Sequence, residues 1–340
     1  MRAHTSWVRF GGENTDFSSA AFGSEDTSFL ETEFGSEVTS FWGARFGSKM
    51  TDFSRARFTG AETSFINARF DVYRSTTPKI FFAEATFMEK VDFVGLKFLD
   101  REATTVFDSR SRVRFDRCQI DKPELFRFHN VVLRPSWFID VDVRKVHFTD
   151  VKWYGLPNGP EGTLREEIDA LREQGVDVPY GVASPHTLLA QACRRLSANA
   201  EESREYPLAN EFHYWSMEAQ RKKMPRYNIS PWRLIWWYWA LNGYGERHIR
   251  AAVWLIAILV GFAALYMWLG PVGAQKNSLI GILGVAWESI VYSLGVMTRL
   301  ANDIPKSAST LVTSLIIIEG VIGPLQIGLF LLALRREFMR

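Results

Sequence analysis

The last quarter of the chain contains two long apolar stretches, which constrain its fold more than any other feature. Residues 251–269 carry no charged side chain, and residues 311–334 carry only Glu319. An α-helix rises 1.5 Å per residue, so about 20 residues cross a hydrocarbon core roughly 30 Å thick. Both stretches are therefore predicted to be transmembrane helices.

A third apolar segment, residues 279–300, lies between these two, and the flanking charges predict its path. Basic residues precede the first stretch and follow the last: Lys222, Lys223, Arg226, Arg233, Arg247, Arg250, Arg335, Arg336 and Arg340. Because Lys and Arg bias flanking segments toward the cytoplasm, both ends are expected inside, which requires an even number of crossings. We therefore interpret residues 279–300 as a re-entrant half-helix, which is tolerated only where protein or water surrounds it.

This arrangement predicts a multi-pass protein of the cell membrane, in bacteria the inner membrane, with cytoplasmic N- and C-termini. The start of the sequence has no basic segment followed by an apolar run, so we expect no secretory signal. Residues 251–340 would then form a pore-like domain in the lipid bilayer.

Phenylalanine recurs through the first part of the chain at spacings that alternate between seven and five residues. The regular positions are Phe10, Phe17, Phe22, Phe29, Phe34, Phe41, Phe46, Phe53, Phe58, Phe65 and Phe70. From Phe17 on, a Thr or Ala stands two positions before each Phe, so both side chains point to the same face of an extended chain. Such a fixed period indicates a solenoid.

The repeat resembles that of pentapeptide-repeat proteins, which have a small residue two positions before a Leu or Phe. The resemblance implies a right-handed, four-sided β-helix over residues 1–153. Since every second unit is two residues longer, we expect about 24 residues per turn, with loops at the Gly-Ser and Glu-Thr corners. The buried Phe side chains should dominate its stability.

Residues 154–250 are predicted to be helical. Residues 154–230 form a connector with a short helix to about residue 174, then helices at about 186–204 and 207–221 that pack as an antiparallel hairpin. Residues 231–250 contain four Trp within ten positions. Indole rings favour the headgroup level, so we expect an interfacial amphipathic helix, with packing against the solenoid as the alternative.

Residues 286–305 are similar to the pore of two-span potassium channels, in which an aromatic pore helix leads into a selectivity filter. The resemblance assigns pore-helix positions to Trp287, Glu288 and Tyr292. The filter candidates are Gly295, Val296, Met297, Thr298 and Arg299. A potassium filter needs glycines that let successive carbonyls point inward, and this segment has one. Three roles are open for Arg299: it would favour anions, pair with an acidic residue, or anchor the chain at the membrane interface. The sequence therefore does not identify the permeant ion.

The last apolar stretch contains the candidate gate residues Glu319, Gly320, Gly323 and Pro324. A carboxylate at bilayer depth costs a few kcal/mol, so Glu319 is expected to face the pore or a neighbouring subunit. The alternative is a neutral, hydrogen-bonded Glu319 between helices. Gly320, Gly323 and Pro324 are predicted to form a hinge, although kinks and close packing also explain such residues.

Composition argues against several other functions. The net charge is +2, so no strong attraction to nucleic acid is expected. The sequence has no nucleophile–base–acid set, phosphate loop or metal-ligand spacing, which predicts a protein that is not an enzyme and needs no cofactor or metal. Cys118 and Cys193 are isolated, as expected for buried thiols in a reducing cytoplasm.

Together these features favour a homo-oligomeric ion channel. Two spans in one chain cannot enclose a pore, so oligomerisation is required, most simply as a tetramer. The solenoid would dock an unknown protein partner or sense a signal. Two alternatives stay open, namely a non-conducting, membrane-anchored scaffold and a toxic pore effector that a partner of the solenoid keeps closed.

Overall fold

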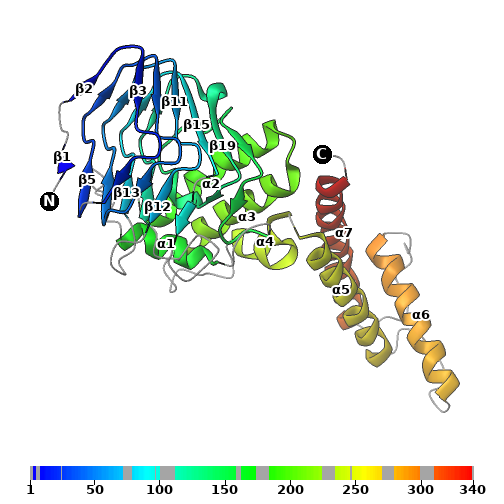
Figure 1. Cartoon of the computed structure of the whole chain (residues 1–340). Coiled ribbons are helices and arrows are strands. Elements are labelled where there is room, and N and C mark those ends of the chain that lie inside the picture. Colours follow the sequence, from blue (N-terminus) through cyan, green and yellow to red (C-terminus); the bar gives the residue numbers. More distant parts are fainter. Residues whose placement is uncertain are drawn as a thin grey trace. The chain divides into compact units, whose positions relative to one another are not determined.

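The chain divides into two compact units, Met1–Met224 and Pro225–Arg340. The computed structural model describes residues 3–4, 8–23, 25–71, 79–95, 97–99, 112–157, 162–173, 184–223, 234–245, 247–269, 279–298 and 310–338. The first unit contains short parallel strands followed by helices, and the described part of the second contains helices (Figure 1).

The strands of the first unit form four parallel stacks. One sheet contains β1 (Ala3–His4), β5 (Asp26–Ser28), β9 (Met50–Asp52), β13 (Lys79–Phe81) and β17 (Arg112–Arg114). The next contains β2 (Arg9–Phe10), β6 (Glu33–Phe34), β10 (Arg57–Phe58), β14 (Thr86–Phe87) and β18 (Gln119–Ile120). The third contains β3 (Asn14–Asp16), β7 (Val38–Ser40), β11 (Glu62–Ser64), β15 (Lys90–Val94), β19 (Phe126–His129) and β21 (His147–Thr149). The fourth contains β4 (Ala21–Phe22), β8 (Arg45–Phe46), β12 (Arg69–Asp71) and β16 (Lys97–Leu99).

Through β17 each strand pairs with the strand four places later, so the chain winds around four faces as a solenoid. In the register Thr27 pairs with Thr51 and Phe34 pairs with Phe58, which confirms the predicted turn of 24 residues. Later turns are longer. The last two strands to be named, β20 (Val132–Leu133) and β22 (Lys152–Trp153), pair with each other in parallel.

The corners differ in the way that their spacing requires. Where five residues separate two Phe residues, the chain makes a tight turn in which residues such as Glu31, Arg55 and Asn67 adopt a positive φ. Where seven residues separate them, bends run through Gly-Ser pairs such as those at 35–36 and 47–48, and the serines Ser36 and Ser48 are buried. The loops expected at the Gly-Ser corners are thus confirmed.

Columns of stacked phenylalanine rings fill the solenoid. Along one column the ring centroids of Phe17, Phe41, Phe65 and Phe93 are separated by 5.0, 4.8 and 4.8 Å. These distances match the spacing between paired strands, because each turn places its ring directly over the ring of the turn before. Rings of neighbouring columns meet edge to face, as Phe41 and Phe53 do at 5.6 Å and 85°.

Three helices follow the strands and belong to the same unit: α1 (Leu164–Glu173), α2 (Pro185–Glu202) and α3 (Tyr206–Lys223). Ser184 caps α2 as predicted, because its side chain accepts a hydrogen bond from the backbone N–H of Thr187. Two short 3-10 helices, η1 (Pro123–Leu125) and η2 (Pro135–Trp137), interrupt the last turns of the solenoid.

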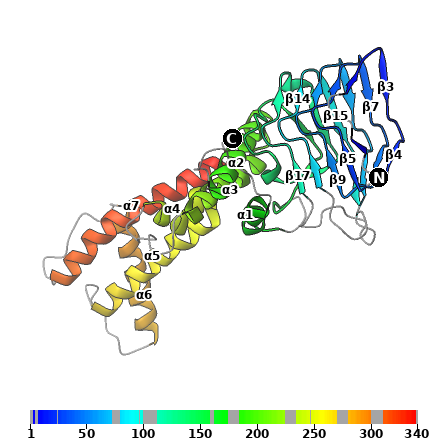
Figure 2. The same cartoon turned by 90° about the vertical axis from the view of Figure 1, so that its left-hand side faces the viewer.

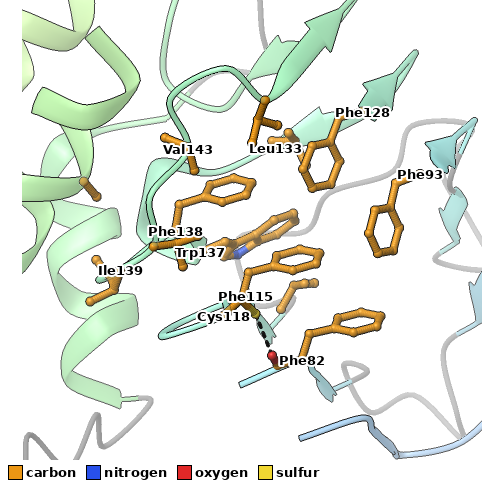
Figure 3. Packing of buried hydrophobic residues seen from close by; sticks show 14 of the residues in the cluster. Phe82, Phe93, Phe115, Cys118, Phe128, Leu133, Trp137, Phe138, Ile139 and Val143 are labelled. Atoms are coloured by element: carbon orange, nitrogen blue, oxygen red, sulfur yellow. Dashed lines mark hydrogen bonds between the residues drawn. The ribbon is translucent and has the colours of Figure 1, made fainter. Parts of the chain in front are cut away.

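The hairpin of α2 and α3 covers the last turns of the solenoid. The ring of Trp153 meets that of Phe212 edge to face at 5.0 Å. Asn199 donates hydrogen bonds of 2.9 Å to the backbone carbonyls of Val143 and Val146. Figure 3 shows the apolar packing in this region, where aromatic rings of the columns meet aliphatic residues near the helices. The predicted hairpin therefore also closes this end of the Phe core.

A buried ion pair joins α1 to the solenoid. The guanidinium of Arg134 donates to Glu167 at 2.6 Å, and both side chains are almost fully buried. The other carboxylate oxygen of Glu167 accepts the backbone N–H of Ser136 at 3.1 Å, and the guanidinium lies 4.3 Å from the ring centroid of Tyr154. Since each charge faces a partner, the pair fixes α1 against the turn at η2.

The second unit contains α4 (Leu234–Asn242), η4 (Gly243–Gly245), α5 (His248–Leu269), α6 (Leu279–Thr298) and α7 (Thr310–Phe338). Two segments, Ile249–Leu269 and Thr310–Arg335, are long and apolar enough to cross a membrane. They match the two spans predicted from the sequence.

The first prediction concerns the Phe columns. Phe65→Ala removes a fully buried ring between two stacked neighbours, so we expect it to lower the free energy of unfolding of the first unit by about 3–5 kcal/mol. Phe10→Ala, at the half-buried first turn, should cost less than half as much. Pulse proteolysis of the full-length protein in urea measures both, and equal losses would contradict the stacking account.

The second prediction concerns the buried pair. Glu167→Gln leaves the guanidinium of Arg134 buried without a counter-charge, and we expect a loss of about 3–5 kcal/mol. The matched control is Glu89→Gln, which breaks the partly exposed pair between Glu89 and Lys122 and should cost less than about 1 kcal/mol. The same urea proteolysis compares the two variants, and a small effect at Glu167 would show that water reaches Arg134.

Candidate functional site

The contacts between α5 and α7 show that these helices are antiparallel. Near the end of α5, the hydroxyl of Tyr266 donates to Glu319, in the first half of α7, at 2.6 Å. Near the start of α5, the carbonyl of Ala251 accepts from the amide of Gln326, further along α7, at 3.0 Å. The start of α5 therefore lies beside the later part of α7 (Figure 2). Arg250 and Arg335 lie toward this same end of the bundle.

Helix α6 runs in the same direction as α7. The hydroxyl of Ser293 donates to Glu319, and one turn further along α6, Met297 packs against Gly323, one turn further along α7. A Cβ built on Gly323 would lie 2.8 Å from Cγ of Met297, so glycine is what permits this approach. The end of α6 thus lies beside the middle of α7, and residues 299–309, which connect the two helices, are outside the described residues.

The length of α6 differs from the half-helix expected from the sequence. It contains 20 residues, equivalent to about 30 Å. Because Ser293 is level with Glu319, the first residues of α6 extend past the start of α7 at Thr310 by about 7 Å. The extra length therefore lies beyond the beginning of α7, while the other end stops near its centre.

A polar cluster holds the three helices together. Tyr266, Ser293 and Glu319 are all fully buried, each on a different helix. Glu319 accepts a hydrogen bond from each of the two hydroxyls, and the ring of Tyr266 meets that of Tyr292 edge to face at 5.1 Å. Of the two positions considered for Glu319, the structure shows the one between helices of the same chain.

The filter candidates are helical as far as the structure describes them. Gly295, Val296, Met297 and Thr298 form the last turn of α6, and Val296 and Met297 are buried. The hydroxyl of Thr298 donates back to the carbonyl of Leu294 at 2.7 Å, as in a regular helix. An extended filter is therefore not formed by these four residues, and Arg299 lies outside the described residues.

The remaining candidates lie in different surroundings. On α6, Trp287 is 67% exposed, Glu288 is exposed and Tyr292 is half-buried. On α7, a Cβ on Gly320 would meet nothing within 4 Å. Pro324 lies inside the helix and has no N–H to donate to the carbonyl of Gly320, which locally weakens α7.

Sequence reasoning missed Tyr266, Ser293 and Gln326. The available signal was their polarity, because each interrupts an apolar helix and must find a hydrogen-bond partner inside the bundle. Helix α4 lies within residues 231–250, where the sequence predicts an interfacial helix, and its Trp237 is 47% exposed. Arg250 of α5 donates to the carbonyl of Trp239 at 3.2 Å and lies 5.6 Å from the centroid of its ring.

Both cysteines are free and buried, as expected from the sequence. Burial raises the pKa of the Cys118 and Cys193 thiols, so both stay protonated at neutral pH. Among the described residues no group of three or more His, Cys, Asp or Glu side chains gathers as a metal site. No protein-family model, curated protein or solved structure matches the chain.

The third prediction tests the register of α6 on α7. Because Ser293 contacts Glu319, Ser293→Cys with Glu319→Cys should form an intrachain cross-link with a short bifunctional thiol reagent in membranes. The control pair, Leu294→Cys with Glu319→Cys, places its first thiol on the exposed side of α6 and should not. Trypsin cuts after Arg299 and Lys306, which lie between the two introduced cysteines. The two fragments therefore stay joined on a non-reducing gel only if the cross-link has formed. Equal yields from the two pairs would contradict the register.

Proposed function

We propose that the chain forms a homo-oligomeric ion channel in the cell membrane. The observation that carries the proposal is the direction of the helices, with α5 antiparallel to α7 and α6 parallel to α7. A chain that crosses along α5, enters again along α6 and leaves along α7 needs a return between α6 and α7. A re-entrant segment supplies that return, and both termini then stay in the cytoplasm.

The outer surface of the helices supports a membrane location. Large apolar side chains are exposed on α5 and α7, and they include Val253, Ile256, Val260, Ile317, Val321 and Leu325. Such residues suit lipid or a second copy of the chain. Since two crossings cannot enclose a pore, several copies are needed, and four is the simplest number by analogy with two-span potassium channels.

The solenoid is proposed to be of the pentapeptide-repeat type, with a right-handed turn, and to act as a cytoplasmic docking or sensing domain. Along one corner of the solenoid, Glu31, Arg55, Glu84 and Arg117 alternate in charge and form successive ion pairs of 3.2, 2.9 and 2.9 Å. Charges of both signs arranged in this way suit contact with another protein better than binding to nucleic acid.

A non-conducting, membrane-anchored scaffold is the second candidate. The observation that favours it is the helical conformation of Gly295–Thr298, since helical carbonyls already accept hydrogen bonds within the helix and are not free to coordinate an ion. Conduction then depends on residues 299–309, which carry the return to α7.

The fourth prediction tests conduction directly. The purified full-length protein in planar bilayers should give discrete current steps, and Gly323→Leu should abolish them, because the larger side chain displaces Met297 and the end of α6. Gly320→Ala is the matched control, since the site is open and its currents should persist.

Two outcomes would contradict the channel. Absence of current from the wild-type protein, with the oligomer intact on size exclusion, would favour the scaffold. Labelling of single-cysteine variants that places the two termini on opposite sides of the membrane would refute the re-entrant path.

A further inference from the structure

The apolar parts of α5, α6 and α7 contain two acidic residues, and the surroundings of these two residues are opposite. Within residues 251–269, 279–298 and 310–334 there is no Lys, Arg or His, and the acids are Glu288 and Glu319. Glu319 is fully buried and accepts two hydrogen bonds. Glu288 is exposed, and no ion pair joins it to any residue that the structure describes. Its carboxylate thus points away from the bundle of its own chain.

The residues around Glu288 divide the surface of α6 into three sides. One side packs inside the bundle and carries Val285, Ser289, Ser293 and Val296, all buried. A second side is exposed and bulky, with Leu283, Trp287 and Leu294. The third side lies between these two at helical spacing and carries Gly284, Glu288 and Gly295. Glu288 therefore lies on a narrow strip of small residues, and Val291, one turn further along α6, is its exposed apolar neighbour.

Hydrocarbon cannot cover this third side. A carboxylate in contact with lipid tails is costly, and such groups face a water-filled cavity or another chain. The apolar side with Trp287 suits lipid or packing between copies, which leaves the side with Glu288 for water. The depth of Glu288 agrees with a position near an aqueous entrance. Glu288 precedes Ser293 by five residues and is thus level with Ser314, about one turn inside the start of α7.

From this position we infer that Glu288 of each copy lines the aqueous entrance of the pore and makes the channel select cations over anions. The inference rests on the proposed function and names its substrate class. Carboxylates from symmetry-related copies would form a ring of negative charge at one depth, a device that attracts cations and excludes anions. It needs no specific filter geometry, which fits the helical conformation of Gly295–Thr298.

The experiment measures reversal potentials and unitary conductance of the full-length protein in planar bilayers under a KCl gradient. The wild type should reverse near the potassium equilibrium potential, Glu288→Gln closer to zero, and Glu288→Lys on the chloride side. In symmetric KCl, the wild-type conductance should exceed that of Glu288→Gln several-fold at low salt and converge with it at high salt, because salt screens the ring. Glu246→Gln removes the same charge outside the three apolar helices and should leave the reversal potential unchanged.

Each outcome decides between the claims. Currents whose reversal potential and salt dependence are the same in the wild type and in Glu288→Gln would overturn the cation ring but leave the channel standing. An equal change in Glu246→Gln would assign the effect to general surface charge and would also overturn it. Absence of current from every variant, including the wild type, would overturn the channel and the ring with it.

Discussion

The second unit depends on one constraint, which is that a carboxyl group inside an apolar bundle must find its hydrogen-bond partners within the protein. Glu319 satisfies this constraint by accepting hydrogen bonds from two hydroxyls on other helices, that of Tyr266 on α5 and that of Ser293 on α6. Apolar packing alone gives little preference between a lipid tail and a neighbouring helix, so it does not fix rotation or depth. The two hydrogen bonds do, because they are made only when all three helices are in register.

The solenoid depends on a different interaction, the stacking of identical rings. The turns up to Phe70 repeat the same sequence of small residue and Phe, so their rings lie over one another at the spacing of paired strands. Such a stack has two ends. The later end is covered by the hairpin of α2 and α3, where Phe212 contacts Trp153, whereas the rings of the first turn, including Phe10, stay half-buried. The helices after the repeat thus complete the core of the solenoid.

The sequence predicts the elements that repeat or that span, and it predicts their mutual contacts less well. A 24-residue turn could be predicted from the Phe spacing because the turns up to Phe70 all obey the same rule, whereas the longer later turns do not. The helices at 185–202 and 206–223 were signalled by Ser184, Pro185 and the spacing of apolar residues. By contrast, the contacts of Glu319 with Tyr266 and Ser293 were not predicted. Hydropathy does not distinguish the side of an apolar helix that faces lipid from the side that faces another helix. The helical conformation of Gly295–Thr298 also departs from the filter that the resemblance implies, because nothing in these four residues prevents continuation of α6.

The two acidic residues of the bundle show how one residue type takes two roles through its position on a helix. Glu319 faces its own chain, where hydroxyls satisfy it, and it therefore contributes to the fold of a single copy. Glu288 faces outward, where its own chain offers no ion pair among the described residues, and a lone copy in lipid would leave it exposed to hydrocarbon. An assembly that encloses water removes this cost, because it gives the same carboxylate a solvated surface. If the helices lie in lipid, the exposed position of Glu288 therefore requires a polar surface outside its own described helices, and the water enclosed by several copies, as the channel proposal has it, supplies one.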